Sequence, residues 1–216
     1  MISCSNIHKQ FGGLQILKGI DLSVAQGELV SIVGASGAGK STLLHILGTL
    51  ETSNQGSVVV DGQIVGDLGG AKLAKFRNEK IGFVFQFHHL LPEFSALENV
   101  LIPAFIKGTK TEIAQKKARE LLGLMGLENR FDHKPHALSG GEQQRVAVAR
   151  ALINSPKVIF ADEPSGNLDS KNAKDLHQMF VMLKNTLACT FVVVTHNEQL
   201  ALLSDRTVVM KDGKIV

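Results

Sequence analysis

Two hydrophobic patterns along the chain predict its strands. Apolar and polar residues alternate over 2–10 and 16–24, which indicates two half-buried antiparallel strands joined by a turn at Gly12 and Gly13. Uninterrupted apolar runs predict fully buried strands at residues 29–33, 81–85, 157–161 and 190–195, and a further strand is expected at 206–210. Residues 56–65 predict a hairpin whose turn is Asp61-Gly62.

Helices are expected between these strands, so the chain has the alternation of an α/β fold. They are predicted at 40–48 and 142–153, from Asp169 or Ser170 to 187, and briefly from 197. Residues 87–137 look helical, with turns at Pro92, Pro103 and Pro135. Thr109 and Glu112 have the spacing of a capping box. An apolar stripe behind them is interpreted as core rather than as a partner groove; it comprises Ile113, Ala118, Leu121, Leu122 and Met125.

Composition narrows the class of protein. The chain has 216 residues, of which 44% are hydrophobic, so it can bury a sizeable core. A formal net charge of +3 is too small to indicate a nucleic-acid partner. With no signal pattern and no long apolar run, we expect a cytoplasmic, soluble chain that docks on a membrane protein at most. Cys4 and Cys189 are interpreted as free thiols.

The strongest chemical signal follows the apolar run 29–33. A glycine-rich loop leads from this strand into a helix with the pattern G-x-x-x-x-G-K-[ST], which cradles phosphates on backbone N–H groups. We expect Lys40 to reach the outer phosphates of a nucleotide and the Ser41 hydroxyl to bind Mg²⁺. The alternative is a glycine-rich turn with a chance lysine. The predicted loop consists of Gly34, Ala35, Ser36, Gly37, Ala38, Gly39, Lys40, Ser41 and Thr42.

Two carboxylates end the apolar run at 157–161. Ligands bind at the carboxyl ends of strands in parallel α/β sheets, so Asp162 suits Mg²⁺ and Glu163 suits a general base that orients the attacking water. Alone, such a pair would be a strand end with solvated charges. A third signal, Ser139, Gly140 and Gly141 at a helix start, makes a second anion site or an ordinary helix cap.

Together these motifs resemble the nucleotide-binding subunits of ATP-binding-cassette (ABC) transporters over nearly the whole chain. The resemblance implies a P-loop NTPase core with a mixed sheet flanked by helices, an antiparallel β subdomain and an inserted α-helical signature subdomain. It implies one domain over 1–216, with residues 1–86 and 157–216 as the core and 87–156 as the helical part. It also implies ATP and Mg²⁺ as ligands.

The resemblance assigns roles to further residues that would each be read as structural if met alone. Gln86 would contact Mg²⁺ and sense the γ-phosphate, and His196 would hydrogen-bond that phosphate. Ser139 and Gly141 would bind the γ-phosphate held by a second copy of the chain, so that two subunits sandwich two ATP molecules. Asp169 would organise the contact between the two copies.

Phe11 is the candidate for stacking on adenine, where this family usually has a tyrosine. It is equally open to a reading as a residue of the small core. Because stacking reads no base edge, the choice between ATP and GTP stays open.

A narrower resemblance lies at residues 86–100, which are similar to the ATPase subunits of lipoprotein-releasing systems. It implies two integral membrane subunits docking near Gln86 to Val100, and a peripheral position on the cytoplasmic face of the bacterial inner membrane. Macrolide or peptide exporters and cell-division complexes are the alternatives. A DNA-associated ATPase is disfavoured because the chain lacks a long coiled-coil insert.

Overall fold

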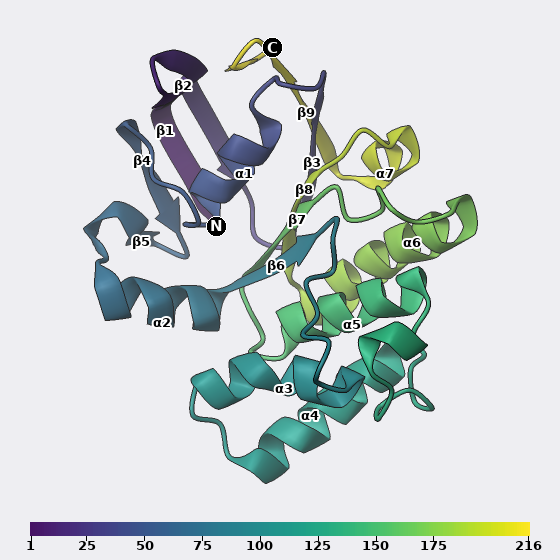
Figure 1. Ribbon diagram of the computed structural model, residues 1–216. Coiled ribbons are helices and arrows are strands. Elements are labelled where there is room, and N and C mark those ends of the chain that lie inside the picture. Colours follow the sequence, from purple (N-terminus) through teal and green to yellow (C-terminus); the bar gives the residue numbers. More distant parts are fainter.

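A six-stranded mixed sheet lies at the centre of the protein, whose computed structural model describes residues 1–216 (Figure 1). The strand order is β10-β9-β3-β8-β7-β6; the four neighbouring pairs from β9 to β6 are parallel, and β10 is antiparallel to β9. The parallel strands end at one edge of the sheet, where the predicted site residues emerge. The strands are β3 (Leu29–Gly34), β6 (Ile81–Phe85), β7 (Val158–Asp162), β8 (Thr190–Val194), β9 (Arg206–Lys211) and β10 (Lys214–Ile215).

A separate four-stranded antiparallel sheet has the order β2-β1-β4-β5. The predicted alternation is confirmed, since buried and exposed residues largely alternate along β1. The buried residues of this sheet join helix α1 and one face of the large sheet in a cluster of 24 residues. The elements are β1 (Ile2–Phe11), β2 (Leu14–Val24), α1 (Lys40–Leu47), β4 (Gln55–Val60) and β5 (Gln63–Ile64).

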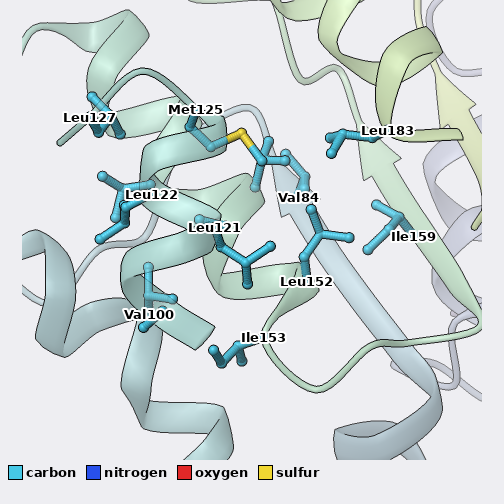
Figure 2. Close-up of a cluster of buried hydrophobic side chains, with 14 of the residues drawn as sticks. Val84, Val100, Leu121, Leu122, Met125, Leu127, Leu152, Ile153, Ile159 and Leu183 are labelled. Atoms are coloured by element: carbon cyan, nitrogen blue, oxygen red, sulfur yellow. The ribbon is translucent and has the colours of Figure 1, made fainter. Parts of the chain in front are cut away.

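Helices cover the other face of the large sheet and form the second core, of 28 buried residues. Figure 2 shows Val100 of α3, Leu121 of α4 and Leu152 of α5 in one cluster, with Ile159 of β7 next to Leu152. The core therefore runs without a break from the helices into the sheet. The helices are α3 (Ala96–Ile106), α4 (Thr111–Leu124), α5 (Gly140–Leu152), α6 (Ser170–Leu187) and α7 (Glu198–Leu203), with 3-10 turns at Val65–Asp67 and Pro135–Ala137.

Two expectations about the region 87–137 are wrong. Pro103 makes no turn but lies inside α3, and its carbonyl accepts from Lys107 N and from the side-chain amides of Asn78 and Asn154. Thr109 and Glu112 form no capping box, since α4 begins one residue later than that spacing requires, at Thr111 after Lys110. Capping boxes form instead at the starts of α3 and α5.

Ile113 is also not part of the core stripe, because it lies one residue before the buried face of α4 that starts at Ala114. The other four stripe residues are buried as predicted. Helix α2 (Gly70–Lys80) had no counterpart in the predicted elements, and it buries none of its residues. None of the helices combines the length and apolar composition that a membrane crossing requires.

Candidate functional site

The loop between β3 and α1 adopts a backbone that needs glycine at its two ends. Gly34 has φ +149°, and a Cβ there would lie 2.1 Å from the carbonyl oxygen of Met210. Gly39 has φ +96°, and its Cβ would lie 2.8 Å from Leu17 Cδ2. The Lys40 ammonium donates to the carbonyl oxygens of Gly34 at 2.9 Å and Ala35 at 3.0 Å, so it folds over the loop. The loop backbone, the N-terminus of α1 and the Lys40 ammonium thus lie together, as an anion-binding site requires.

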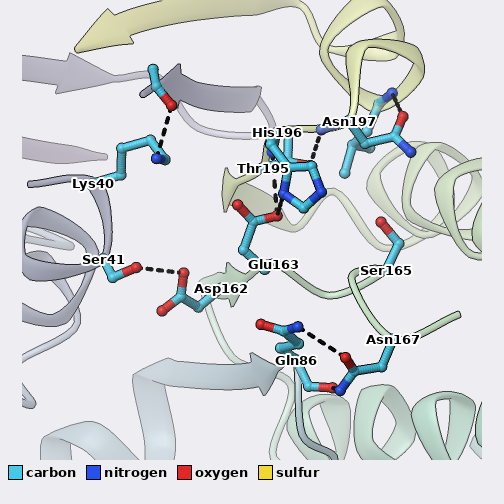
Figure 3. Close-up of polar contacts among 12 residues, drawn as sticks. Lys40, Ser41, Gln86, Asp162, Glu163, Ser165, Asn167, Thr195, His196 and Asn197 are labelled. Atoms are coloured by element: carbon cyan, nitrogen blue, oxygen red, sulfur yellow. Dashed lines mark hydrogen bonds and ion pairs between the residues drawn. The ribbon is translucent and has the colours of Figure 1, made fainter. Parts of the chain in front are cut away.

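Ser41 in the first turn of α1 meets Asp162 at the end of β7. Its hydroxyl donates to Asp162 Oδ1 at 2.9 Å, as Figure 3 shows. Burial raises the pKa of the Asp162 carboxyl, while the Ser41 hydrogen bond and the nearby His45 and Lys40 oppose that rise. A hydroxyl and a carboxylate side by side are hard oxygen ligands of the kind Mg²⁺ prefers, and a cation would relieve the desolvated charge. The residues present therefore fit a magnesium ion.

Glu163 turns away from the strand and pairs with His196. Its backbone has φ +45°, in the left-handed region that non-glycine residues rarely adopt, and its N–H donates to Val194 O at 2.9 Å. Glu163 Oε2 lies 2.9 Å from His196 Nδ1 and accepts from His196 N at 3.2 Å. Residues that follow β7 and β8 are thus brought together (Figure 3).

Gln86 follows β6, whose last residue Phe85 pairs with Asp162 of β7. Its side-chain nitrogen donates to Asn167 Oδ1 at 2.9 Å, and Asn167 Nδ2 donates to the Gln86 carbonyl at 3.3 Å. Asn167 is not among the predicted site residues, because no local pattern reveals a partner 81 residues away.

The start of α5 lies apart from this group, and no hydrogen bond joins residues 139–141 to the loop 34–42. Ser139 caps α5: its hydroxyl accepts from Glu142 N at 3.3 Å, and its N–H donates to Glu142 Oε2 at 2.8 Å. Arg130 Nε donates to the other carboxylate oxygen at 2.8 Å. The spacing Ser-x-x-Glu is the local signal that could have identified this box.

Asp169 and Gly141 meet through Asn172. Asp169 caps α6 and accepts from Asn172 N at 2.9 Å and Nδ2 at 2.6 Å, and these bonds lower the pKa of its carboxyl. A Cβ on Gly141 would lie 2.4 Å from Asn172 Oδ1, so glycine is required there for close packing. The starts of α5 and α6 therefore form one unit.

Phe11 lies at the end of β1 and is 48% exposed, so the alternative prediction, that Phe11 is a core residue, is wrong. The ammonium of Lys9 lies 4.7 Å from the centre of its ring and is itself bound to Glu51 Oε1 and Thr52 O. Lys9 is buried, and the sequence analysis did not single it out. The ammonium thus makes a cation–π contact with a ring that is about half exposed.

Comparison with known proteins places this geometry in a family. The family model described as "ABC transporter" matches residues 17–166. The chain belongs to the ABC transporter family. As a member of this family it is an ATP-binding cassette ATPase, and the predicted fold class and the resemblance to ABC transporter subunits are confirmed.

Curated relatives of this cassette align with it from end to end. A protein of Bacteroides thetaiotaomicron, named lipoprotein-releasing system ATP-binding protein LolD, is 60% identical, covering 100% of this chain and 99% of the relative. The LolD protein of Geobacter metallireducens is 57% identical over 94% of this chain and 90% of its own.

Solved structures of cassettes match the whole fold. A dimeric post-hydrolysis state of the ATP-binding cassette MJ0796 bound to ADP and Pi has a TM-score of 0.90 and 42% identity, covering 100% of this chain and 96% of the other. A second dimeric structure of MJ0796, a bacterial ABC transporter cassette, has a TM-score of 0.91 and 43% identity over the same shares.

Proposed function

We propose that this chain is the ATP-hydrolysing subunit of a complex that releases lipoproteins from the bacterial inner membrane. The observation that carries the proposal is the 60% identity to a LolD protein over the entire chain. We place the chain on the cytoplasmic face of that membrane as a peripheral subunit. We also propose the division into residues 1–86 and 157–216 as nucleotide-binding core and 87–156 as the helical subdomain.

ATP would bind with its phosphates on the loop Gly34–Thr42 and its adenine on Phe11. Lys40 would exchange the carbonyls of its own loop for the outer phosphates, a charge-assisted contact. Ser41, Asp162 and Gln86 would hold Mg²⁺, which neutralises charge on the phosphates. Phe11 supplies a ring but no hydroxyl, so the base is held by stacking.

Glu163 would act as the general base on the attacking water. Its carboxylate is held by the backbone N–H and ring of His196, so both side chains stand at the end of the sheet next to Asp162. His196 would bond the γ-phosphate and keep the base oriented. Holding the base and the phosphate donor in a fixed geometry would favour catalysis by positioning.

A second copy of the chain would complete the site. Residues Ser139, Gly140 and Gly141 make no contact with the phosphate loop of their own chain, yet they form a capped helix start suited to an anion. In a sandwich dimer they would bind the γ-phosphate held by the partner subunit. The dimeric MJ0796 structures support this arrangement for a cassette of the same fold.

The membrane subunits would dock beside Gln86–Val100. Three large apolar side chains of this segment are exposed, namely Phe87, Leu91 and Phe94. Leu97, which the same apolar run includes, is 7% exposed and belongs to the core, so it serves the fold instead.

The docking surface can be tested with matched lysine substitutions. Leu91 is 43% exposed, and Leu124 at the end of α4 is 41% exposed. Leu91→Lys should lose co-purification with the membrane subunits and lipoprotein release from proteoliposomes, with ATP affinity unchanged. Leu124→Lys should keep all three. A fully active Leu91→Lys complex would place the interface elsewhere.

A further inference from the structure

Gln144 of α5 is a fully buried polar residue that the proposed chemistry does not use. Its Nε2 donates to Phe85 O at 3.1 Å and to Pro164 O at 2.8 Å. Its Oε1 contacts His88 Nδ1. One side chain thus binds three segments that are far apart in the sequence.

The donors and acceptors at Gln144 can be assigned from chemistry. Both carbonyls need a donor, so the amide nitrogen must face them and the amide oxygen must face the histidine. His88 therefore carries a proton on Nδ1 and donates it. The bond to Pro164 is buried and the other two bonds are partly buried, so leaving any of these polar atoms unpaired would be unfavourable.

The bound carbonyls are next to two proposed active-site residues. Phe85 directly precedes Gln86, and Pro164 directly follows Glu163. The helix that carries Gln144 begins at Ser139. A displacement of the start of α5 must therefore either break these bonds or move the backbone beside Gln86 and Glu163.

We propose that Gln144 is a positioning residue that couples the two ATP sites of the dimer. This inference rests on the proposed sandwich, in which the start of α5 binds the partner's nucleotide while Gln86 and Glu163 act on the chain's own. Contact with one nucleotide then sets the geometry at the other through a single amide. Binding of ATP needs no such link, whereas hydrolysis does.

The same helix offers a control for simple loss of packing. Asn154, just past the end of α5, also donates from one buried amide to two backbone carbonyls, those of Asn78 and Pro103, each at 3.0 Å. Neither carbonyl adjoins a proposed active-site residue. Gln144→Leu and Asn154→Leu therefore remove the same kind of contact and differ in what it touches.

The test is ATP hydrolysis by the assembled transporter over a range of ATP concentrations. Gln144→Leu should lower kcat by about tenfold or more with KM little changed, and should turn a sigmoidal dependence on ATP into a hyperbolic one. Asn154→Leu should keep the wild-type kcat and curve. His88→Leu removes one of the three bonds outside the deep core, so it should lower kcat in the same direction but less, even where Gln144→Leu folds poorly.

The inference is overturned by any of three results. They are a hyperbolic wild-type curve, a kcat of Gln144→Leu or His88→Leu equal to wild type, or equal losses in Gln144→Leu and Asn154→Leu. A light-scattering measurement of dimer formation distinguishes failure of the coupling proposal from failure of the proposed sandwich dimer. If Glu163→Gln forms no dimer in ATP, the proposed function fails; if it dimerises and Gln144→Leu hydrolyses normally, the coupling alone fails.

Discussion

Replacing Glu142 with glutamine should destabilise the start of α5 by removing a charged pair while keeping the helix cap. The Glu142 carboxylate accepts from Ser139 N at 2.8 Å and from Arg130 Nε at 2.8 Å. These hydrogen bonds, that of Ser139 first, lower the pKa of Glu142 from 4.5 to about 2. Glutamine can still accept from Ser139 N, so the substitution isolates the charge.

The magnitude follows from the pKa. A fall of that size corresponds to about 3 kcal/mol of stability at most. The side chain of Arg130 is 42% exposed, so solvent screening reduces the expected loss to about 1–2 kcal/mol. Because the folded state lowers the pKa, this stabilisation is present above pH 4.5 and is lost as the pH falls towards 2.

Glu98 provides the matched control, since it closes the same capping box with Ser95 at the start of α3 and has no arginine partner. Urea unfolding at neutral pH should show a loss for Glu142→Gln that exceeds the loss for Glu98→Gln by about 1–2 kcal/mol. The difference should shrink as the pH approaches 2. Equal losses for the two variants at neutral pH would refute the reasoning.

Three further predictions concern the nucleotide site. Asp162→Asn should abolish Mg²⁺-dependent hydrolysis yet raise the melting temperature at pH 8. Burial raises the pKa of Asp162, so the ionised carboxylate destabilises the folded state increasingly as the pH rises through that pKa. A variant no more stable than wild type at pH 8 would contradict this. Lys40→Ala should weaken ATP binding about tenfold or more by calorimetry, and unchanged affinity would remove Lys40 from the site. Phe11→Ala should weaken ATP and GTP alike by about 1–3 kcal/mol while Phe11→Tyr binds normally; normal binding by Phe11→Ala would exclude stacking.

Local patterns in the sequence predicted the features whose causes are local. The order strand, glycine loop and helix at residues 29–48 needs only neighbouring residues, and the structure contains each part. The buried strands β6, β7 and β8 were also predicted from local sequence, because a short apolar run is typical of a strand buried in the core of a domain. Once strands are parallel, the meeting of Asp162 with Ser41 at their carboxyl ends follows from the fold.

Features that depend on distant partners could not be predicted. Asn167 binds Gln86 across 81 residues, and Gln144 binds carbonyls 59 and 20 residues away. Helix α2 buries none of its residues, so the sequence has no apolar stripe that would predict it. Pro103 predicted a turn because proline lacks an N–H, yet it lies inside α3, where amides from two other segments bind its carbonyl.

The hydrolysis rate of Glu163→Gln in the presence of saturating MgATP tests the central claim most directly. The amide keeps the shape of the side chain but cannot take a proton from water, and general-base assistance contributes about 10²–10⁴-fold. The account predicts a rate at least about 100-fold below wild type, with ATP still bound, because the base acts in the transition state. A rate close to that of the wild-type protein would contradict it.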